Sequence, residues 1–177
     1  MKTSAMVKAA LIAALTAVAA SVRINLPFTE VPLTLQVFFV LLAGAVLGPI
    51  YGALSMLVYV LMGAIGLPVF AGGATGIGVL IGPTGGYLFG FIAAAYVVGF
   101  LVSRRRKSTT QLALAMVAGL IVIYLFGVLQ LAFVTKITIL KAVLVGAVPF
   151  IIFDLVKAFV AATVARRIGL ATERQSG

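Results

Sequence analysis

The sequence predicts an all-α integral membrane protein of six transmembrane helices, and three observations lead to this fold class. Of the 177 residues, 64% are hydrophobic and 9% are charged, and the mean hydropathy is +1.31, far outside the range of soluble domains. No charged residue occurs between Glu30 and Arg104. The basic residues gather at the ends of apolar runs. Because one span needs about 20 apolar residues, we expect a single compact domain, residues 1–177, that crosses the membrane roughly five to seven times.

Six apolar runs are assigned as spans, in chain order. A basic start followed by an apolar run, 9–20, is also typical of a cleaved signal peptide, but no soluble domain follows, so we expect the first helix to be retained. The second and third runs are separated by the turn Leu47-Gly48-Pro49. Both are short for full spans, and one is expected to be tilted, broken or partly loop. The spans occupy approximately residues 5–22, 35–47, 50–65, 85–102, 112–134 and 139–165.

The basic residues predict the orientation. They form three clusters: Lys2 and Lys8 before the first span, Arg104 to Lys107 after the fourth, and Arg166, Arg167 and Arg174 after the sixth. An even number of spans separates these clusters, and cytoplasmic loops are enriched in Lys and Arg. We therefore expect both termini in the cytoplasm. Lys136 and Lys141 would face outward and snorkel to the headgroups.

The composition also excludes several functions. A net charge of +10 can indicate nucleic-acid binding, but here the basic residues flank apolar runs, so anionic lipid is the expected partner and nucleic acid is not. Cysteine and histidine are absent and only three residues are acidic, which removes thiol nucleophiles, imidazole bases and the usual zinc ligands. No phosphate-binding GxxxxGK motif is present. The sequence predicts no enzyme, no metal and no cofactor.

Asp154 and Lys157 are the candidate chemical groups within a span. Their three-residue spacing places them on one face of a helix, and an ionisable group inside a membrane costs at least about 2.5 kcal/mol to insert. One interpretation is a self-neutralising pair that fixes the helix to its neighbours. We favour a ligand site, because intramembrane charges usually face a cavity. Pro149, one turn upstream, frees a carbonyl that can face the same cavity.

Two irregular stretches are expected on the outer side. The glycine-rich stretch 66–86 breaks helical structure and lets backbone approach a ligand closely, although it also suits an ordinary loop with a glycine packing face. The stretch 23–36 suits a lid over a cavity. Within it, Thr34 and Gln36 lie nearest the membrane and are the better candidates for ligand contacts. Arg23 and Glu30 are interpreted as a solvated ion pair.

Small residues line the first helix at four-residue spacing. Ala9 and Ala13 lie on one face, with Ala10 and Ala14 beside them. Such spacing lets another helix approach closely in lipid. The partner is either another helix of the same bundle or a second protein.

Several motifs together resemble the BioY family, the biotin-binding subunits of energy-coupling-factor (ECF) transporters. They are Val31-Pro32-Leu33-Thr34-Leu35-Gln36, Gly66-Leu67-Pro68-Val69-Phe70-Ala71-Gly72-Gly73, Gly82-Pro83-Thr84-Gly85-Gly86-Tyr87-Leu88, and the late Pro149, Asp154 and Lys157. The resemblance extends from about Ala9 to Arg167. It implies an ECF S-component-like bundle of six helices with an outward-facing biotin pocket closed by outer loops.

The resemblance also implies roles for individual residues. Asp154 and Lys157 would contribute to the pocket, and Tyr87, Gly72 and Gly73 fall where pocket residues are expected. The alanine face of the first helix would dock on a transmembrane coupling protein, and cytoplasmic ATPases would supply energy. The sequence leaves open whether this chain requires those partners or transports biotin without them, for example as a homo-oligomer.

Other functions remain as alternatives. An S component for another small vitamin would share the whole pattern. A passive channel would need a continuous polar lining, whereas the polar residues here lie in one layer and on the outer side. An intramembrane transferase or hydrolase would need several acidic metal ligands, or a nucleophile with a base, which Asp154 alone does not supply.

Overall fold

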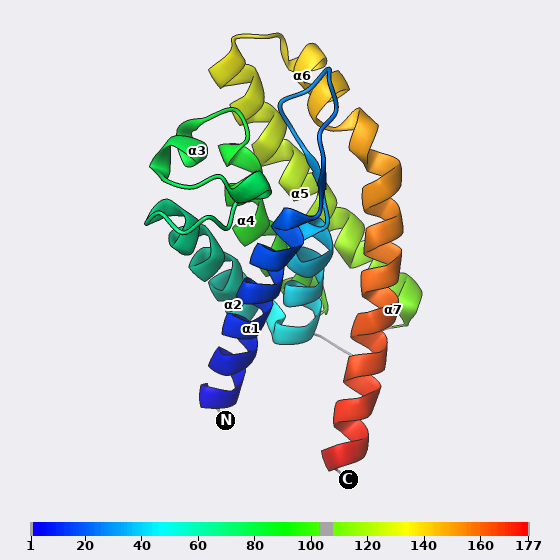
Figure 1. The fold of residues 1–177 in the computed structure, drawn as a ribbon. Helices are drawn as coiled ribbons and strands as arrows, with labels where there is room; N and C mark the ends of the chain where they lie inside the picture. The colour runs from blue at the N-terminus through cyan, green and yellow to red at the C-terminus, as the bar shows by residue number, and fades with distance from the viewer. Residues whose placement is uncertain (1, 103–107, 177) are drawn as a thin grey trace.

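The computed structural model describes residues 2–102 and 108–176, and they form a helical bundle (Figure 1). The basic cluster Arg104 to Lys107 lies outside the described residues. The long helices are α1 (Lys2–Ser21), α2 (Gln36–Ala64), α4 (Gly85–Val102), α5 (Thr109–Thr135), α6 (Ile139–Gly146) and α7 (Ile151–Ser176). The shorter elements are β1 (Arg23–Ile24), β2 (Leu33–Thr34), η1 (Ala71–Gly73), α3 (Ile77–Ile81) and η2 (Val148–Phe150).

Five stretches of the described chain are long and apolar enough to cross a membrane. They are residues 3–21, 36–64, 85–102, 109–135 and 139–169. The second comprises two helical halves, because α2 is interrupted at Gly48, where φ is 77° and ψ is −178°. This conformation is essentially restricted to glycine, and Pro49 follows it. The two halves are drawn as separate rods in Figure 1. Counted as two helices, they bring the five apolar stretches to six helices, and the predicted all-α fold with six helices is confirmed.

The last apolar run is divided in the structure. The sequence predicts one span over residues 139–165, whereas α6 ends at Gly146 and α7 begins at Ile151, with η2 between them. Pro149 lies in this break. Proline interrupts a helix because it lacks an N–H and its ring clashes with the preceding turn. Helix α7 therefore begins within the apolar run, and Asp154 falls in its first turn.

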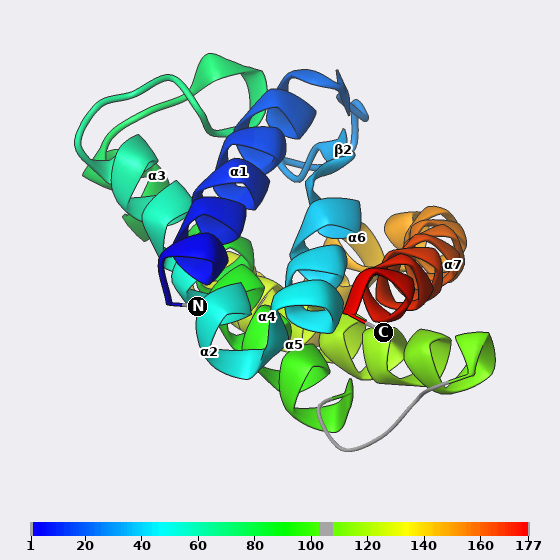
Figure 2. The ribbon, with the colours of Figure 1, turned by 90° about the horizontal axis from the view of Figure 1, so that it is seen from below.

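The helices pack around α2 and α5. Helix α2 contacts α1, α4 and α7, and helix α5 contacts α4, α6 and α7. The start of α1 and the end of α7 lie at the same end of the bundle (Figure 1), which Figure 2 shows from below. Large side chains such as Phe133 and Ile65 are exposed on the outside, as expected where the surrounding solvent is lipid.

Helix α1 packs one of its two alanine faces inward. Ala9 and Ala13 are buried against the bundle, and the Ser55 hydroxyl of α2 donates a hydrogen bond of 2.8 Å to the Ala9 carbonyl. Ala10 and Ala14 are exposed. The close approach that small residues permit is thus used by Ala9 and Ala13 within the chain. Only Ala10 and Ala14 remain on the surface that another protein can reach.

Candidate functional site

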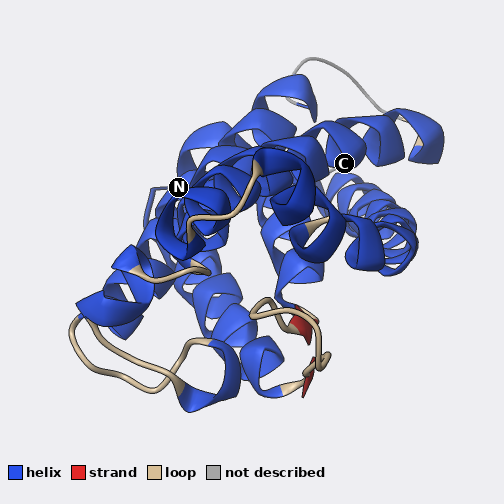
Figure 3. Ribbon diagram, turned by 90° about the horizontal axis from the view of Figure 1, so that it is seen from above, coloured by secondary structure: helices blue, strands red, loops and turns tan. Residues whose placement is uncertain are grey.

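A cavity of about 410 Å³ opens between the two irregular segments and the helices behind them. This volume lies within the range of small-molecule sites. Seen from above, the segment with β1 and β2 and the segment between α2 and α4 lie on one side of the bundle (Figure 3). The two segments thus contribute the accessible side of the cavity, while α4, α5 and α7 contribute its inner wall.

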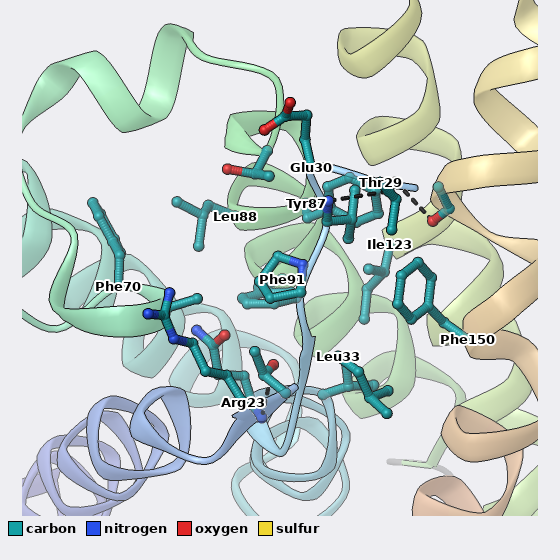
Figure 4. A pocket seen from close by; sticks show the side chains of 18 of the residues that line it. Arg23, Thr29, Glu30, Leu33, Phe70, Tyr87, Leu88, Phe91, Ile123 and Phe150 are labelled. Carbon is teal, nitrogen blue, oxygen red and sulfur yellow. Dashed lines mark hydrogen bonds between the residues drawn. The ribbon is translucent and has the colours of Figure 1, made fainter. Parts of the chain in front are cut away.

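The wall of the cavity is partly apolar and partly polar. Phe70, Leu88, Phe91, Ile123 and Phe150 supply apolar surface (Figure 4). Polar groups come from both irregular segments and from the helices. An apolar wall with a few placed polar groups is typical of a site that binds and orients a small molecule.

Asp154 and Lys157 form a hydrogen-bonded ion pair in the wall. Lys157 Nζ lies 2.7 Å from Asp154 Oδ1, and it also donates a hydrogen bond of 2.6 Å to the Thr34 carbonyl. The Tyr124 hydroxyl donates to Asp154 Oδ2 at 2.6 Å. The first turn of a helix favours a carboxylate, because the unpaired N–H groups there carry partial positive charge. The break at Pro149 thus places the buried Asp154 carboxylate in the first turn of α7, within reach of Lys157 and Tyr124.

Gln36 takes part in a second polar chain. Its Nε2 donates to the Tyr59 hydroxyl at 2.5 Å, and that hydroxyl donates to the Val69 carbonyl at 3.0 Å. The Gln36 backbone N–H donates to Thr34 Oγ1. Thr34 and Gln36 are both buried. These bonds fix the start of α2 against the glycine-rich segment and hold the Gln36 amide in the cavity wall.

Tyr87 is held by the break between α6 and α7. Its hydroxyl donates a hydrogen bond of 2.8 Å to the Gly146 carbonyl. That carbonyl is available because the Phe150 N–H donates to the Ala147 carbonyl instead. A buried carbonyl needs a partner, and Tyr87 supplies it. The tyrosine ring therefore stands at a fixed place in the cavity wall.

The structure brings together five of the seven residues that the sequence singled out for ligand binding. These five line one cavity: Thr34, Gln36, Tyr87, Asp154 and Lys157. Gly72 and Gly73 do not line it, although their neighbours Ala71 and Ala74 do. The glycines turn the chain with positive φ values of 74° and 77°. Gly72 and Gly73 therefore lie next to residues of the cavity wall but are not part of the wall.

Two further residues take a different place from the one predicted. Arg23 and Glu30 do not form an ion pair in the described part of the chain, and both line the cavity. They lie on the exposed segment before α2. Sequence reasoning also missed Tyr124, which holds Asp154. A hydroxyl in the middle of the apolar run 112–134 was the signal that could have identified it.

Comparison with known proteins gives matches over almost the whole chain. The model of the BioY family matches residues 1–174. A biotin transporter BioY from Thermotoga maritima is 50% identical over 163 residues, covering 92% of this chain and 94% of the relative. A probable biotin transporter BioY from Pyrococcus horikoshii is 45% identical over 159 residues, covering 90% and 92%.

A solved structure shares the fold. The crystal structure of the S-component for biotin from an ECF-type ABC transporter superposes with a TM-score of 0.88 at 26% sequence identity. The superposition covers 94% of this chain and 91% of the crystallised one. On the family match and the identity to curated relatives, this chain belongs to the BioY family.

Proposed function

We propose that this protein captures biotin in the cavity and serves in its uptake as the substrate-binding component of an ECF-type transporter. The observation that carries the proposal is the similarity to the biotin S-component over nearly the whole chain. The cavity supports it independently, because a buried Asp154–Lys157 pair faces a space of small-molecule size. The protein is a multi-pass membrane protein and not an enzyme.

The lining of the cavity matches the chemistry of biotin. The ligand has a flat ureido ring with N–H donors and a carbonyl acceptor, an apolar bicyclic body with an alkyl chain, and a carboxylate. Asp154 can accept ureido N–H bonds, and such bonds to a charged group are the stronger kind. Phe91, Leu88 and Phe150 offer apolar surface for the body and chain. The site therefore supplies partners for the ureido ring and for the apolar part of the ligand.

Biotin is expected to stabilise the purified protein against heat, whereas other vitamins are not. A ligand that binds only the folded state at about 100 times its Kd adds ~2.7 kcal/mol to the free energy of unfolding. The measurement is thermal unfolding in detergent with biotin, riboflavin or thiamine, together with calorimetric titration. Stabilisation by another vitamin but not by biotin would instead favour an S component for that vitamin. Unchanged melting with every vitamin would contradict a vitamin site.

Both termini are proposed to face the cytoplasm of a prokaryotic cell. The two ends lie at the same end of the bundle, and Arg166 and Arg167 lie near the end of α7, on the side where the positive-inside rule places basic residues. Reporter fusions after Lys107 and after Lys136 are expected to report opposite sides of the membrane, the first cytoplasmic. A periplasmic signal at Lys107 would reverse the orientation and place the cavity on the wrong side for uptake.

The proposed partners are a transmembrane coupling protein and cytoplasmic ATPases, with membrane lipid around the bundle. The exposed Ala10 and Ala14 are proposed as the docking surface for the coupling protein, because small side chains allow a second helix to approach closely. Uptake by the purified chain alone in liposomes would instead support a transporter that works without these partners.

A further inference from the structure

The Gly-Pro-Thr-Gly-Gly stretch, residues 82–86, joins α3 to α4, and one side chain of α5 holds it in place. Gln130 Nε2 donates a hydrogen bond of 2.7 Å to the Leu80 carbonyl and one of 2.8 Å to the Gly82 carbonyl. A side-chain amide has two N–H donors, so both are used. Leu80 lies in the last turn of α3, where carbonyls lack a partner within the helix. Gln130 thus fastens the end of α3 to α5.

Gly85 and Gly86 make room for this contact. A Cβ added at Gly85 would meet the Leu80 carbonyl and Gln130 Nε2, and a Cβ added at Gly86 would meet Gln130 Cβ and the Phe126 carbonyl. Neither glycine has a positive φ. The stretch therefore needs these two glycines for space rather than for an unusual backbone conformation, and what fills that space is the Gln130 side chain and the α5 backbone.

The contact lies outside the cavity but fixes part of its wall. Gln130 does not line the cavity, whereas Val79 and Thr84 do. These two residues flank the carbonyls of Leu80 and Gly82, to which Gln130 donates. The Gly82 carbonyl also accepts the Gly85 N–H at the start of α4. The two hydrogen bonds from Gln130 therefore hold both Val79 and Thr84 at a fixed place relative to α5.

We infer that Gln130 is a positioning residue for ligand capture, which holds the stretch 79–84 against α5 before a ligand is bound. The inference rests on the proposed function, since it takes biotin as the ligand. A wall that is already ordered adds to affinity, because binding does not bear the cost of ordering it. If only a fraction of the molecules has the wall in place, the apparent affinity falls by that fraction.

The test is Gln130→Met, which keeps an unbranched side chain and removes both donors. We expect calorimetric titration to show biotin affinity lowered about tenfold, because the net loss of neutral hydrogen bonds changes an equilibrium constant by about this factor. In the ligand-free variant, backbone amides of residues 79–85 are expected to exchange hydrogen faster than in wild type, as measured by mass spectrometry. Saturation with biotin should return their exchange to the wild-type rate.

Three matched variants separate this role from general effects of substitution. Leu129→Met places the same side chain at the neighbouring, exposed residue of α5 and is expected to change neither affinity nor exchange. Gly85→Ala keeps the donors of Gln130 but fills the space they occupy, so it is expected to reproduce the loss of affinity. Gly78→Ala, whose Cβ would have no heavy atom within 4 Å, is expected to bind biotin as wild type does.

Wild-type affinity in a folded Gln130→Met, or wild-type exchange in the stretch 79–85, would overturn the inference. Faster exchange in every helix together with a lower melting temperature would also overturn it, because Gln130 would then be a general packing residue. A wild type that does not bind biotin contradicts the proposed function itself. The exchange of the ligand-free protein still decides in that case whether Gln130 holds the stretch.

Discussion

Removing either charge of the Asp154–Lys157 pair is expected to abolish biotin binding. In Asp154→Asn, Lys157 keeps its charge but loses the carboxylate that lies 2.7 Å away. In Lys157→Ala, Asp154 retains only Tyr124 as a hydrogen-bond partner among the described side chains. Breaking a buried pair on one side typically costs ~3–5 kcal/mol. Because part of this cost falls on folding, calorimetric titration with biotin must be accompanied by thermal unfolding of each variant.

A doubly neutral variant distinguishes a ligand site from a structural pair. Asp154→Asn combined with Lys157→Met leaves no unpaired charge, and replacing a buried ion pair by neutral groups is often neutral for stability. We expect this variant to unfold near the wild-type temperature and still not bind biotin. Wild-type affinity in the folded double variant would assign the pair a structural role only.

Bulky residues at Ala10 and Ala14 are expected to stop uptake while leaving biotin affinity intact. Both alanines are exposed on α1, and neither lines the cavity. Overpacking a close interface typically costs ~1–3 kcal/mol, and ~1.4 kcal/mol already lowers association tenfold. The combined Ala10→Leu and Ala14→Leu variant should therefore fail to co-purify with the coupling protein, and cells that express it should take up little biotin.

The two faces of α1 provide the comparison. Leucine at the buried Ala9 and Ala13 is expected to lower the melting temperature, because these residues pack inside the bundle. Leu114→Phe, which adds bulk at an exposed position of α5, is expected to change neither stability nor uptake. Normal uptake by the Ala10 and Ala14 variant would remove the docking role from α1.

The elements of the fold were predictable because their signals are local. Long apolar runs identify spanning helices without reference to any distant residue, and Gly48-Pro49 marks the interruption of α2 in the sequence itself. The spacing of Asp154 and Lys157 predicts their pairing, since both lie on one helix. The family motifs are also local, and they contain half of the residues that line the cavity.

The remaining features depend on contacts between distant parts of the chain. Tyr124 reaches Asp154 across 30 positions, and Lys157 reaches Thr34 across 123. No sequence pattern encodes such distances. The separation of Arg23 from Glu30 and the inward face of α1 likewise follow from how the helices pack. The sequence therefore predicted which residues matter more reliably than which residues they contact.

The hydrogen bond from Lys157 to the Thr34 carbonyl has a consequence for the kinetics of ligand capture. If the segment before α2 swings away to admit a ligand, this ammonium loses an acceptor, and a hydrogen bond to a charged group is worth ~1.5–3 kcal/mol. A difference of this size leaves the open form as a minor population of the free protein, roughly 0.1–10%. The ligand then associates only with this open form. The observed association rate constant therefore falls below the diffusion limit by the fraction of the protein that is open.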